Sequence, residues 1–269
     1  MSAFSATPWS ARAADREVAL RYVRYSHQNT IAYGLLRDDV IDELAGPPFG
    51  SPEPTGRTVA ASEVRLLAPC EPSKVLAVGL NYRSHLDGRP LPDPPGIFIK
   101  LPTSIAGPGD PIVLPADAHN VHYEGELVIV IGRRAHGVAA AVADDYVFGV
   151  TAGNDVSERD WQRDDLQWFR AKGCDTFGPI GPVIATDLDY GNLHLQTRVN
   201  GEVRQEQSTN DIVYGILEIV SYISHYATLL PGDVIFTGTP GNTQAVRNGD
   251  AVEVEIEGIG VLRNTVLRP

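Results

Sequence analysis

Three acidic residues lie in a pattern that suits a divalent cation. Glu124 and Glu126 open an apolar run, and Asp155 follows a second one. Side chains alternate between the two faces of a β-strand, so Glu124 and Glu126 are expected on the same face. Two like charges this close are costly unless a positive group lies between them. Carboxylate oxygens suit a hard cation such as Mg²⁺, Mn²⁺ or Ca²⁺ better than zinc.

The alternative for such an acidic pair is a solvated outer face of a sheet. Residues 127–132, however, are apolar at every position after the pair. Strands of this kind are covered on both faces, which would place the acids at the rim of a core. We therefore prefer the metal site to the solvated face.

Composition excludes several classes of partner. The chain has 269 residues, enough for one large domain or a large domain with a small appendage, and a net charge of −12. Nucleic acids and anionic membranes attract basic surfaces, so neither is an expected partner. No apolar run reaches the roughly 18 residues of a membrane helix, and residues 1–20 lack the pattern of a secretory signal. Cys70 and Cys174 form no disulfide or metal-binding framework. We expect a cytoplasmic protein.

Lysine is rare in this chain. Of its 22 basic residues only three are lysines, namely Lys74, Lys100 and Lys172. A lysine in an arginine-rich background is a candidate for a role that needs a compact charge or a removable proton. Chance placement is the alternative for each of them.

The apolar patterns predict a mixed α/β, β-rich fold. Residues 18–44 read as strands joined by turns, and residues 45–58 as a loop or linker rich in Gly, Pro and Ser. A strand at 75–80 opens the main domain. We therefore expect a small N-terminal domain with its linker at 1–70 and a catalytic domain at 71–269.

Further elements are expected within the larger domain. Apolar residues recur with a helical period between 213 and 226, and the segment 157–166 has acidic residues at its start, which is typical of a helix. The other predicted elements are a short helix ending near 144–145 and strands at 97–100, 234–236 and 252–257.

Six segments, in this order, resemble the fumarylacetoacetate hydrolase superfamily. They are GLNYxxH at 79–85, HYEGEL at 122–127, NDVSERD at 154–160, RAKG at 170–173, VNGExRQ at 199–205 and GDxxxTGTP at 232–240. The resemblance spans about residues 74–268, and residues 18–44 are similar to the small N-terminal domain common in that family. It implies a mixed β-roll core, a divalent metal held by three carboxylates, and usually a homodimer.

The resemblance also implies a chemistry. Glu124, Glu126 and Asp155 occupy the positions of the family's metal ligands, so Mg²⁺ or Mn²⁺ is the expected cofactor, with Ca²⁺ possible in a crystal. The family acts on small 2-oxo acids, chiefly acylpyruvates and muconate-derived dioates. Its members hydrolyse C–C bonds, decarboxylate, or shift double bonds through a shared enolate. A 2-oxo acid can chelate a cation, which then stabilises the adjacent enolate.

Four residues are candidates for contacting the substrate. Lys172 is similar to the family lysine beside the chelating oxygens, and a surface lysine is its alternative. Arg159 and Gln162 follow Asp155 at helical spacing, which suits them to gripping a substrate carboxylate. A salt bridge from Arg159 to Asp155 or Asp160 is the competing interpretation. Thr239, in a Gly-Thr-Pro turn, resembles a carboxylate contact or is a plain turn residue.

Two histidines carry different expectations. His122 shares the face of the acidic pair, and we expect it to be structural or to support the site rather than to bind the metal. His85 is the candidate general acid–base residue, because a neutral imidazole can activate water or move a proton near pH 7. Many family members carry a glutamate three residues after this histidine, on a closing lid. This chain has Gly88 there, and Asp87 is the catalytic candidate in its place.

The leading functional hypothesis is a metal-dependent C–C bond hydrolase of an acylpyruvate-like 2,4-dioxo acid, with water activated by His85. An isomerase or decarboxylase of a 2-hydroxymuconate-type or 2-oxo dioic acid needs the same residues except the water-activating pair. A third hypothesis is a non-catalytic module that binds a small anion. A dinucleotide-binding enzyme is excluded, because no GxGxxG follows a strand.

Overall fold

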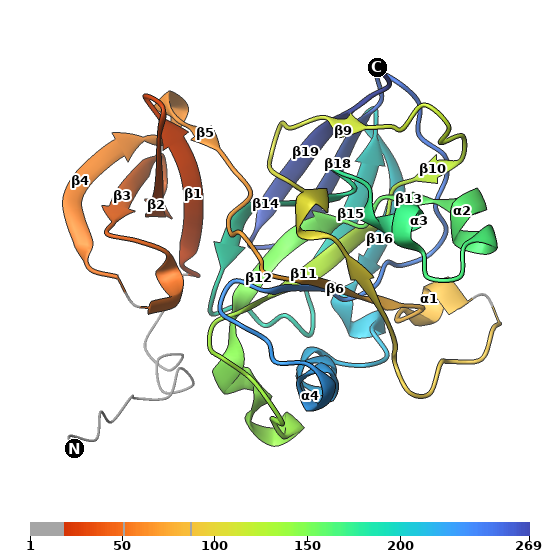
Figure 1. Cartoon of the computed structure of the whole chain (residues 1–269). Helices are drawn as coiled ribbons and strands as arrows, with labels where there is room; N and C mark the ends of the chain where they lie inside the picture. Colours follow the sequence, from red (N-terminus) through yellow and green to blue (C-terminus); the bar gives the residue numbers. More distant parts are fainter. Residues whose placement is uncertain (1–18, 51, 87) are drawn as a thin grey trace.

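The computed structural model describes residues 19–50, 52–86 and 88–269 (Figure 1). The fold is mixed α/β and strand-rich, as the sequence predicted. Among the described residues, twelve strands form one large sheet whose main path runs β4-β3-β2-β1-β14-β12-β11-β17-β6-β7. The strands on this path are β1 (Arg21–His27), β2 (Thr30–Arg37), β3 (Val40–Leu44), β4 (Pro54–Ala60), β6 (Val75–Gly79), β7 (Gly96–Lys100), β11 (Gly125–Ile131), β12 (Val147–Asn154), β14 (Gly178–Ala185) and β17 (Val234–Phe236).

A second sheet of five strands packs beside the first. Its order is β16-β15-β18-β19-β9, and a short pair, β10 with β13, lies near the site. These strands and the two that join the large sheet off its main path are β5 (Arg65–Leu66), β8 (Ile105–Ala106), β9 (Ile112–Val113), β10 (Val121–His122), β13 (Ser157–Glu158), β15 (His194–Val199), β16 (Glu202–Ser208), β18 (Ala251–Ile256) and β19 (Gly260–Leu267).

Strands β1 to β4 form a meander that stands apart from the core in Figure 1. Two residue pairs, Arg21 with Ala185 and Tyr22 with Ile184, join β1 to β14. The sequence placed a loop or linker at 45–58, and this was wrong for its last residues, which begin β4. Most of β4 is exposed, so it shows no apolar alternation, and its pairing with β3 determines its conformation.

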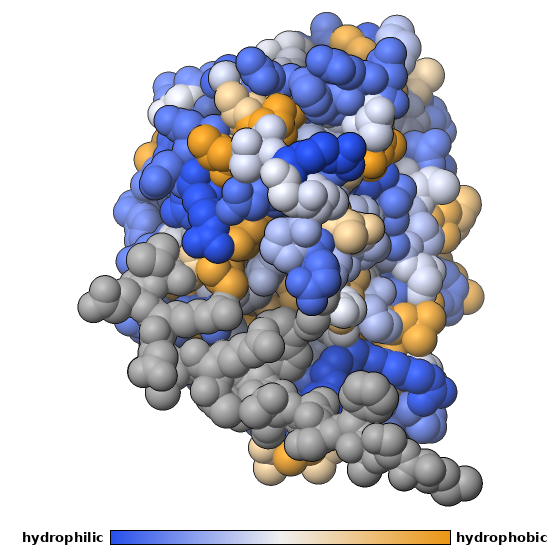
Figure 2. Space-filling model, turned by 90° about the vertical axis from the view of Figure 1, so that its left-hand side faces the viewer, coloured by the Kyte–Doolittle hydropathy of each residue, from blue (hydrophilic) through white to orange (hydrophobic). Residues whose placement is uncertain are grey.

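The outer face of the meander is largely hydrophilic. Figure 2 views the molecule from that side and shows hydrophobic residues scattered among hydrophilic ones. Ile31 of β2 and Val40 of β3 are among the exposed apolar side chains of the meander.

Within the described ranges, no helix is both long enough and apolar enough to cross a membrane.

In the part of the chain that the structure describes, four α-helices lie around the core: α1 (Arg83–Leu86), α2 (Arg159–Asp164), α3 (Phe169–Gly173) and α4 (Ile216–Tyr226). The helix expected over 157–166 begins only at Arg159, because Ser157 and Glu158 pair with β10 as strand β13. The Glu158 carboxylate then accepts a hydrogen bond from the Trp161 amide and caps the helix. The helix expected over 213–226 begins at Ile216. The short helix expected near 144 is a 3₁₀ segment, Ala140–Tyr146.

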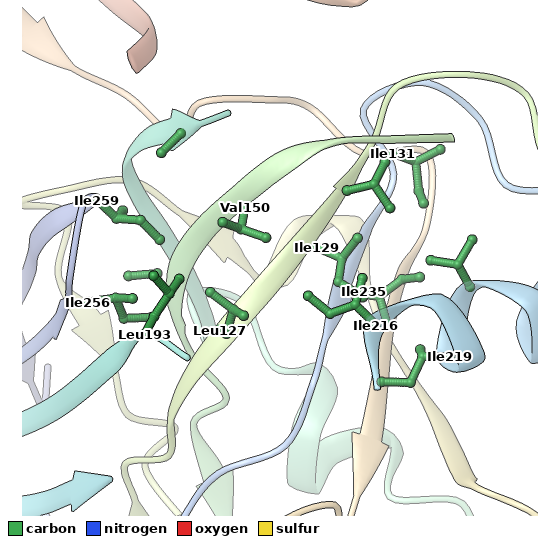
Figure 3. Packing of buried hydrophobic residues seen from close by; sticks show 14 of the residues in the cluster. Leu127, Ile129, Ile131, Val150, Leu193, Ile216, Ile219, Ile235, Ile256 and Ile259 are labelled. Carbon is green, nitrogen blue, oxygen red and sulfur yellow. The ribbon is translucent and has the colours of Figure 1, made fainter. Parts of the chain in front are cut away.

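Strand β11 lies at the centre of the molecule and is buried at every residue. Leu127, Ile129 and Ile131 point to one apolar cluster, which includes residues of helix α4 (Figure 3). Val128 and Val130 point to a second cluster on the opposite face. The strand is thus covered on both faces, as its unbroken apolar run predicted. This position holds the residues at its N-terminal end firmly in place.

Gly149 tests how tightly these central strands pack. A Cβ on Gly149 of β12 would lie 2.4 Å from the carbonyl oxygen of Ala185 in β14. Gly149→Ala should therefore lower the free energy of unfolding by about 1–3 kcal/mol, because the strands must separate to accept the methyl group. Gly46→Ala is the matched control, since nothing lies within 4 Å of its added Cβ. Urea unfolding curves would measure both, and equal midpoints would contradict the tight packing.

Candidate active site

The antiparallel pair β11 and β12 brings the three carboxylates together. Gly125 at the start of β11 pairs with Asn154 at the end of β12. Glu124 therefore directly precedes one strand, and Asp155 directly follows the other. The Asp155 amide donates to the Glu124 carbonyl at 2.9 Å, and the Glu124 amide donates to the Asn154 side-chain oxygen at 2.9 Å. Two chain segments distant in sequence are thus locked side by side.

The three carboxylates form one buried cluster. Glu124, Glu126 and Asp155 each offer an oxygen, and these oxygens all lie within 4.8 Å of one another. All three residues are at most 5% exposed. The Glu126 carboxylate accepts a hydrogen bond from the Gly238 amide at 2.7 Å. Burial and the neighbouring Asp155 and Glu124 raise the pKa of Glu126 well above its usual value.

Lys172 neutralises part of this charge. Its ammonium donates to Glu124 at 2.7 Å and to Asp155 at 2.6 Å, and the side chain is 2% exposed. The alternative of a surface lysine is therefore wrong. Burial alone would lower the pKa of Lys172, but Asp155 and Glu124 outweigh it and raise that pKa. Lys172 thus keeps its charge inside the protein.

Lys100 is a site residue to which the sequence analysis gave no role. It ends strand β7, is fully buried, and its Nζ lies 2.7 Å from Asp155 Oδ1. The same ammonium donates to the carbonyl of Lys172. Burial lowers the pKa of Lys100; Asp155 opposes this effect and Lys172 adds to it. The rarity of lysine was the one available signal, and it did not distinguish Lys100 from Lys74, which pairs with Asp233 away from the cavity.

Arg159 begins helix α2 and reaches the acidic cluster. One guanidinium nitrogen lies 2.5 Å from Glu124 Oε1 and 2.8 Å from Thr243 Oγ1, and the other donates to Gln162 at 2.7 Å. The salt bridge that was the competing interpretation for Arg159 thus goes to Glu124, not to Asp155 or Asp160. Burial would raise the pKa of Glu124, but Arg159 and Lys172 together lower it far below its usual value.

These residues fit a hard divalent cation. The oxygens of three buried carboxylates converge, and carboxylate oxygen is the donor such ions prefer. Asp155 Oδ1 is buried without a well-aligned hydrogen bond, although Lys100 lies 2.7 Å away. Within the described ranges, no histidine or cysteine joins the cluster. The donor set therefore matches Mg²⁺ or Mn²⁺ better than zinc.

His122 is held by two neighbours instead. Its ring nitrogens contact Thr243 Oγ1 and Asn120 Oδ1, each at 2.9 Å. Burial, followed by the charge of Arg159, lowers the pKa of His122 to about 4. The ring thus stays neutral near pH 7 and links β10 to the Thr243 segment.

His85 and Thr239 line the same cavity from two other segments. His85 lies on helix α1, and its Nδ1 contacts the Gly241 carbonyl. Thr239 donates to the Gly125 carbonyl at 2.9 Å and accepts from the Gln205 amide at 2.8 Å. In this conformation the Thr239 hydroxyl is occupied by the protein's own groups. The remaining catalytic candidate, Asp87, lies outside the described residues.

A cavity of about 460 Å³ joins these groups. Its walls include the acidic cluster, His85, Lys172, Arg159 and Gln162, together with Thr239. The cavity is also lined by residues to which the sequence analysis gave no role. These are Arg89, Phe98, Arg163, Trp168, Asn242 and Thr243. Figure 1 shows α1, α2 and α3 on the side of the core away from the β1–β4 meander.

Comparison with known proteins agrees with this geometry. A family model described as fumarylacetoacetate (FAA) hydrolase C-terminal matches residues 74–267, and one described as Rv2993c-like, N-terminal matches residues 20–69. Protein Rv2993c of Mycobacterium tuberculosis is 53% identical over 232 residues, or 84% of this chain and 87% of that protein. Human mitochondrial oxaloacetate tautomerase FAHD2A is 42% identical over 221 residues, or 77% of this chain and 70% of that protein.

A solved structure gives the same result. The crystal structure of 5-carboxymethyl-2-hydroxymuconate delta-isomerase from Mycobacterium smegmatis is 49% identical, with a TM-score of 0.88, and the match covers 93% of this chain and 100% of that one. The resemblance found in the six sequence segments is confirmed. The chain belongs to the fumarylacetoacetate hydrolase family.

Proposed function

We propose that this protein is a divalent-cation-dependent isomerase, of the tautomerase type, that moves a proton at carbon 3 of a small 2-oxo acid. The observation that carries the proposal is a single cavity that joins the acidic cluster and Lys172 to His85. The cluster supplies a cation site, Lys172 supplies a buried positive charge, and His85 supplies a base. A base that takes the proton and positive groups beside the developing oxyanion both promote proton transfer next to a carbonyl group.

The cofactor in this proposal is Mg²⁺ or Mn²⁺ held by Glu124, Glu126 and Asp155. When bound, such an ion supplies a Lewis acid that favours negative charge on the 2-oxygen of the substrate. Lys172 stands beside the same carboxylates and adds a second positive charge on a buried side chain. Arg159 and Gln162 hold the carboxylate end of the substrate.

His85 moves the proton. A carbonyl oxygen can only accept a hydrogen bond, so the contact with Gly241 requires the hydrogen on Nδ1. The neutral ring then carries its lone pair on Nε2. This nitrogen takes the proton from carbon 3, the C–H electron pair forms a C2–C3 double bond, and the 2-oxygen takes the negative charge. Return of the proton to oxygen gives the enol, and return to carbon gives the keto form.

Isomerisation is preferred here over the hydrolysis that the sequence analysis favoured. Hydrolysis needs a second group beside His85 to activate water, whereas proton transfer needs only one base. Two relatives are named as an oxaloacetate tautomerase and a 5-carboxymethyl-2-hydroxymuconate delta-isomerase, which supports proton transfer. C–C bond hydrolysis is the second candidate, because Asp87 lies two residues after His85 in the sequence.

The reaction class can be tested by product analysis with Mn²⁺ added. The protein should accelerate keto–enol interconversion of a compact 2-oxo dioate such as oxaloacetate, and the exchange of its carbon 3 hydrogen for deuterium, without breaking the carbon chain. His85→Ala should slow this exchange by about 10²–10⁴-fold. Mass spectrometry and proton NMR would follow the products. Release of pyruvate from an acylpyruvate, without exchange in the dioate, would favour the hydrolase instead.

Cation binding can be measured without any substrate. Titration with Mn²⁺ should reveal one site, and Asp155→Asn should weaken it by at least about tenfold, because one of three charged oxygen ligands is lost. Asp160→Asn is the matched control, since its carboxylate is 42% exposed and pairs with Arg163. Equal affinity of Asp155→Asn and the unchanged protein would place the cation elsewhere.

A variant of Lys172 would distinguish cation binding from turnover. Lys172→Met keeps the length of the side chain but removes the ammonium beside Glu124 and Asp155. Mn²⁺ should then bind at least as tightly, because a repelling charge is gone, while turnover should fall by about 10²-fold or more. Calorimetry and the exchange assay would measure the two effects. Full turnover in this variant would remove the proposed role of Lys172.

A further inference from the structure

We infer that Asp211 is a positioning residue that holds His85 in the cavity. Asp211 ends the 3₁₀ segment η6 (Thr209–Asp211) and is not among the residues that line the cavity. Its carboxylate instead bonds to the helix that carries His85. The inference rests on the proposed function, in which His85 is the base.

Helix α1 cannot hold His85 in place by itself. It has four residues, Arg83–Leu86, and isolated helices shorter than about 12–15 residues are marginal in water. At its start, the His85 amide donates to the Tyr82 carbonyl at 3.0 Å. The orientation of the imidazole therefore depends on contacts with other segments.

Asp211 provides two of these contacts. Its Oδ2 accepts from the Ser84 amide at 3.0 Å and from the Ser84 hydroxyl at 2.6 Å. Bonds to an ionised carboxylate are stronger than those between neutral groups. Arg83 adds longer bonds to the backbone of the same region, with Asn210 at 3.4 Å and Ile212 at 3.2 Å. Both residues before His85 are thus tied to η6 and the residue that follows it.

The contact continues to the imidazole ring. Ser84 Oγ donates to Asp211 and accepts from the Gly241 amide at 3.3 Å. The carbonyl of the same Gly241 accepts from His85 Nδ1. Asp211 therefore fixes Ser84 against the loop that orients the ring, and one chain of hydrogen bonds sets both the position of the helix and the tautomer of His85.

Local structure does not need the Asp211 carboxylate. The 3₁₀ segment is capped by Ser208, whose hydroxyl accepts from the Asn210 amide. Besides the bonds from Ser84, the carboxylate accepts a long hydrogen bond of 3.5 Å from the Gln207 side-chain amide. The side chain is directed toward helix α1 rather than toward its own segment.

The test compares Asp211→Ala with Asp189→Ala. Asp189 is an exposed aspartate near the same segment, and its carboxylate bonds within its own turn. Asp211→Ala should lower kcat at least tenfold with a KM change below threefold, because the substrate is held by the cation and Arg159. Amides of residues 82–86 should exchange with deuterium faster in Asp211→Ala, and Mn²⁺ affinity should stay constant. Asp189→Ala should change none of these.

A double variant decides whether Asp211 acts through His85. In the His85→Ala background, Asp211→Ala should cause no further loss of kcat, whereas a general structural defect would add to it. Ser84→Ala, at an exposed position, should shift kcat in the same direction by a smaller factor. If Asp211→Ala keeps full kcat while His85→Ala loses activity, the positioning role of Asp211 is overturned and the proposed function stands. No effect of His85→Ala would instead overturn the proposed function.

Discussion

The site depends on repulsion between three buried carboxylates that the fold forces together. The pairing of Gly125 with Asn154 fixes Glu124 and Asp155 next to the ends of two adjacent strands, and Glu126 follows directly after Gly125. Charges buried so close together are tolerated only with compensation. Lys172, Lys100 and Arg159 supply it from helix α3, strand β7 and helix α2. Helix α3, strand β7 and helix α2 are thus all bound to the core through the same acidic cluster.

This compensation is uneven, and the unevenness suits catalysis. Glu124 contacts two cationic side chains, whereas Glu126 receives a bond from the Gly238 amide and its pKa is raised. A cation entering the cluster would relieve that remaining repulsion. Lys172 and Arg159 line the cavity, whereas Lys100 is fully buried and is not among the residues that line it. The cavity therefore faces two of the three compensating charges.

The sequence predicted the parts that follow from local patterns. The unbroken apolar run after Glu126 marked a strand covered on both faces, and the ordered motifs led to the correct family and fold. Strand β4 was missed because its residues are mostly exposed and its pairing with β3 is invisible in a hydropathy pattern. The helix boundaries at Arg159 and Ile216 were displaced by tertiary pairing and capping.

Side-chain partners across the fold were harder to foresee. Lys100 reaches Asp155 from an edge strand. Arg159 pairs with Glu124, although other acidic residues lie closer to it in the sequence. The partner in each ion pair depends on where strands and helices meet in space. The spacing of residues along the sequence does not show this. The tether between Asp211 and Ser84 joins residues 127 positions apart, and neither side chain belongs to a pattern of apolar periodicity.

Gly125, between the two glutamates, constrains how strand β11 can be aligned. Its missing side chain leaves room for Thr197 of β15, since a Cβ there would lie 2.0 Å from Thr197 Oγ1. A shift of β11 by a single residue would push a glutamate side chain into this contact and turn every apolar residue to the opposite face. Gly125 therefore helps to determine how β11 is aligned with its neighbours. An insertion or deletion next to Gly125 should therefore disrupt the packing of β11 on both of its faces.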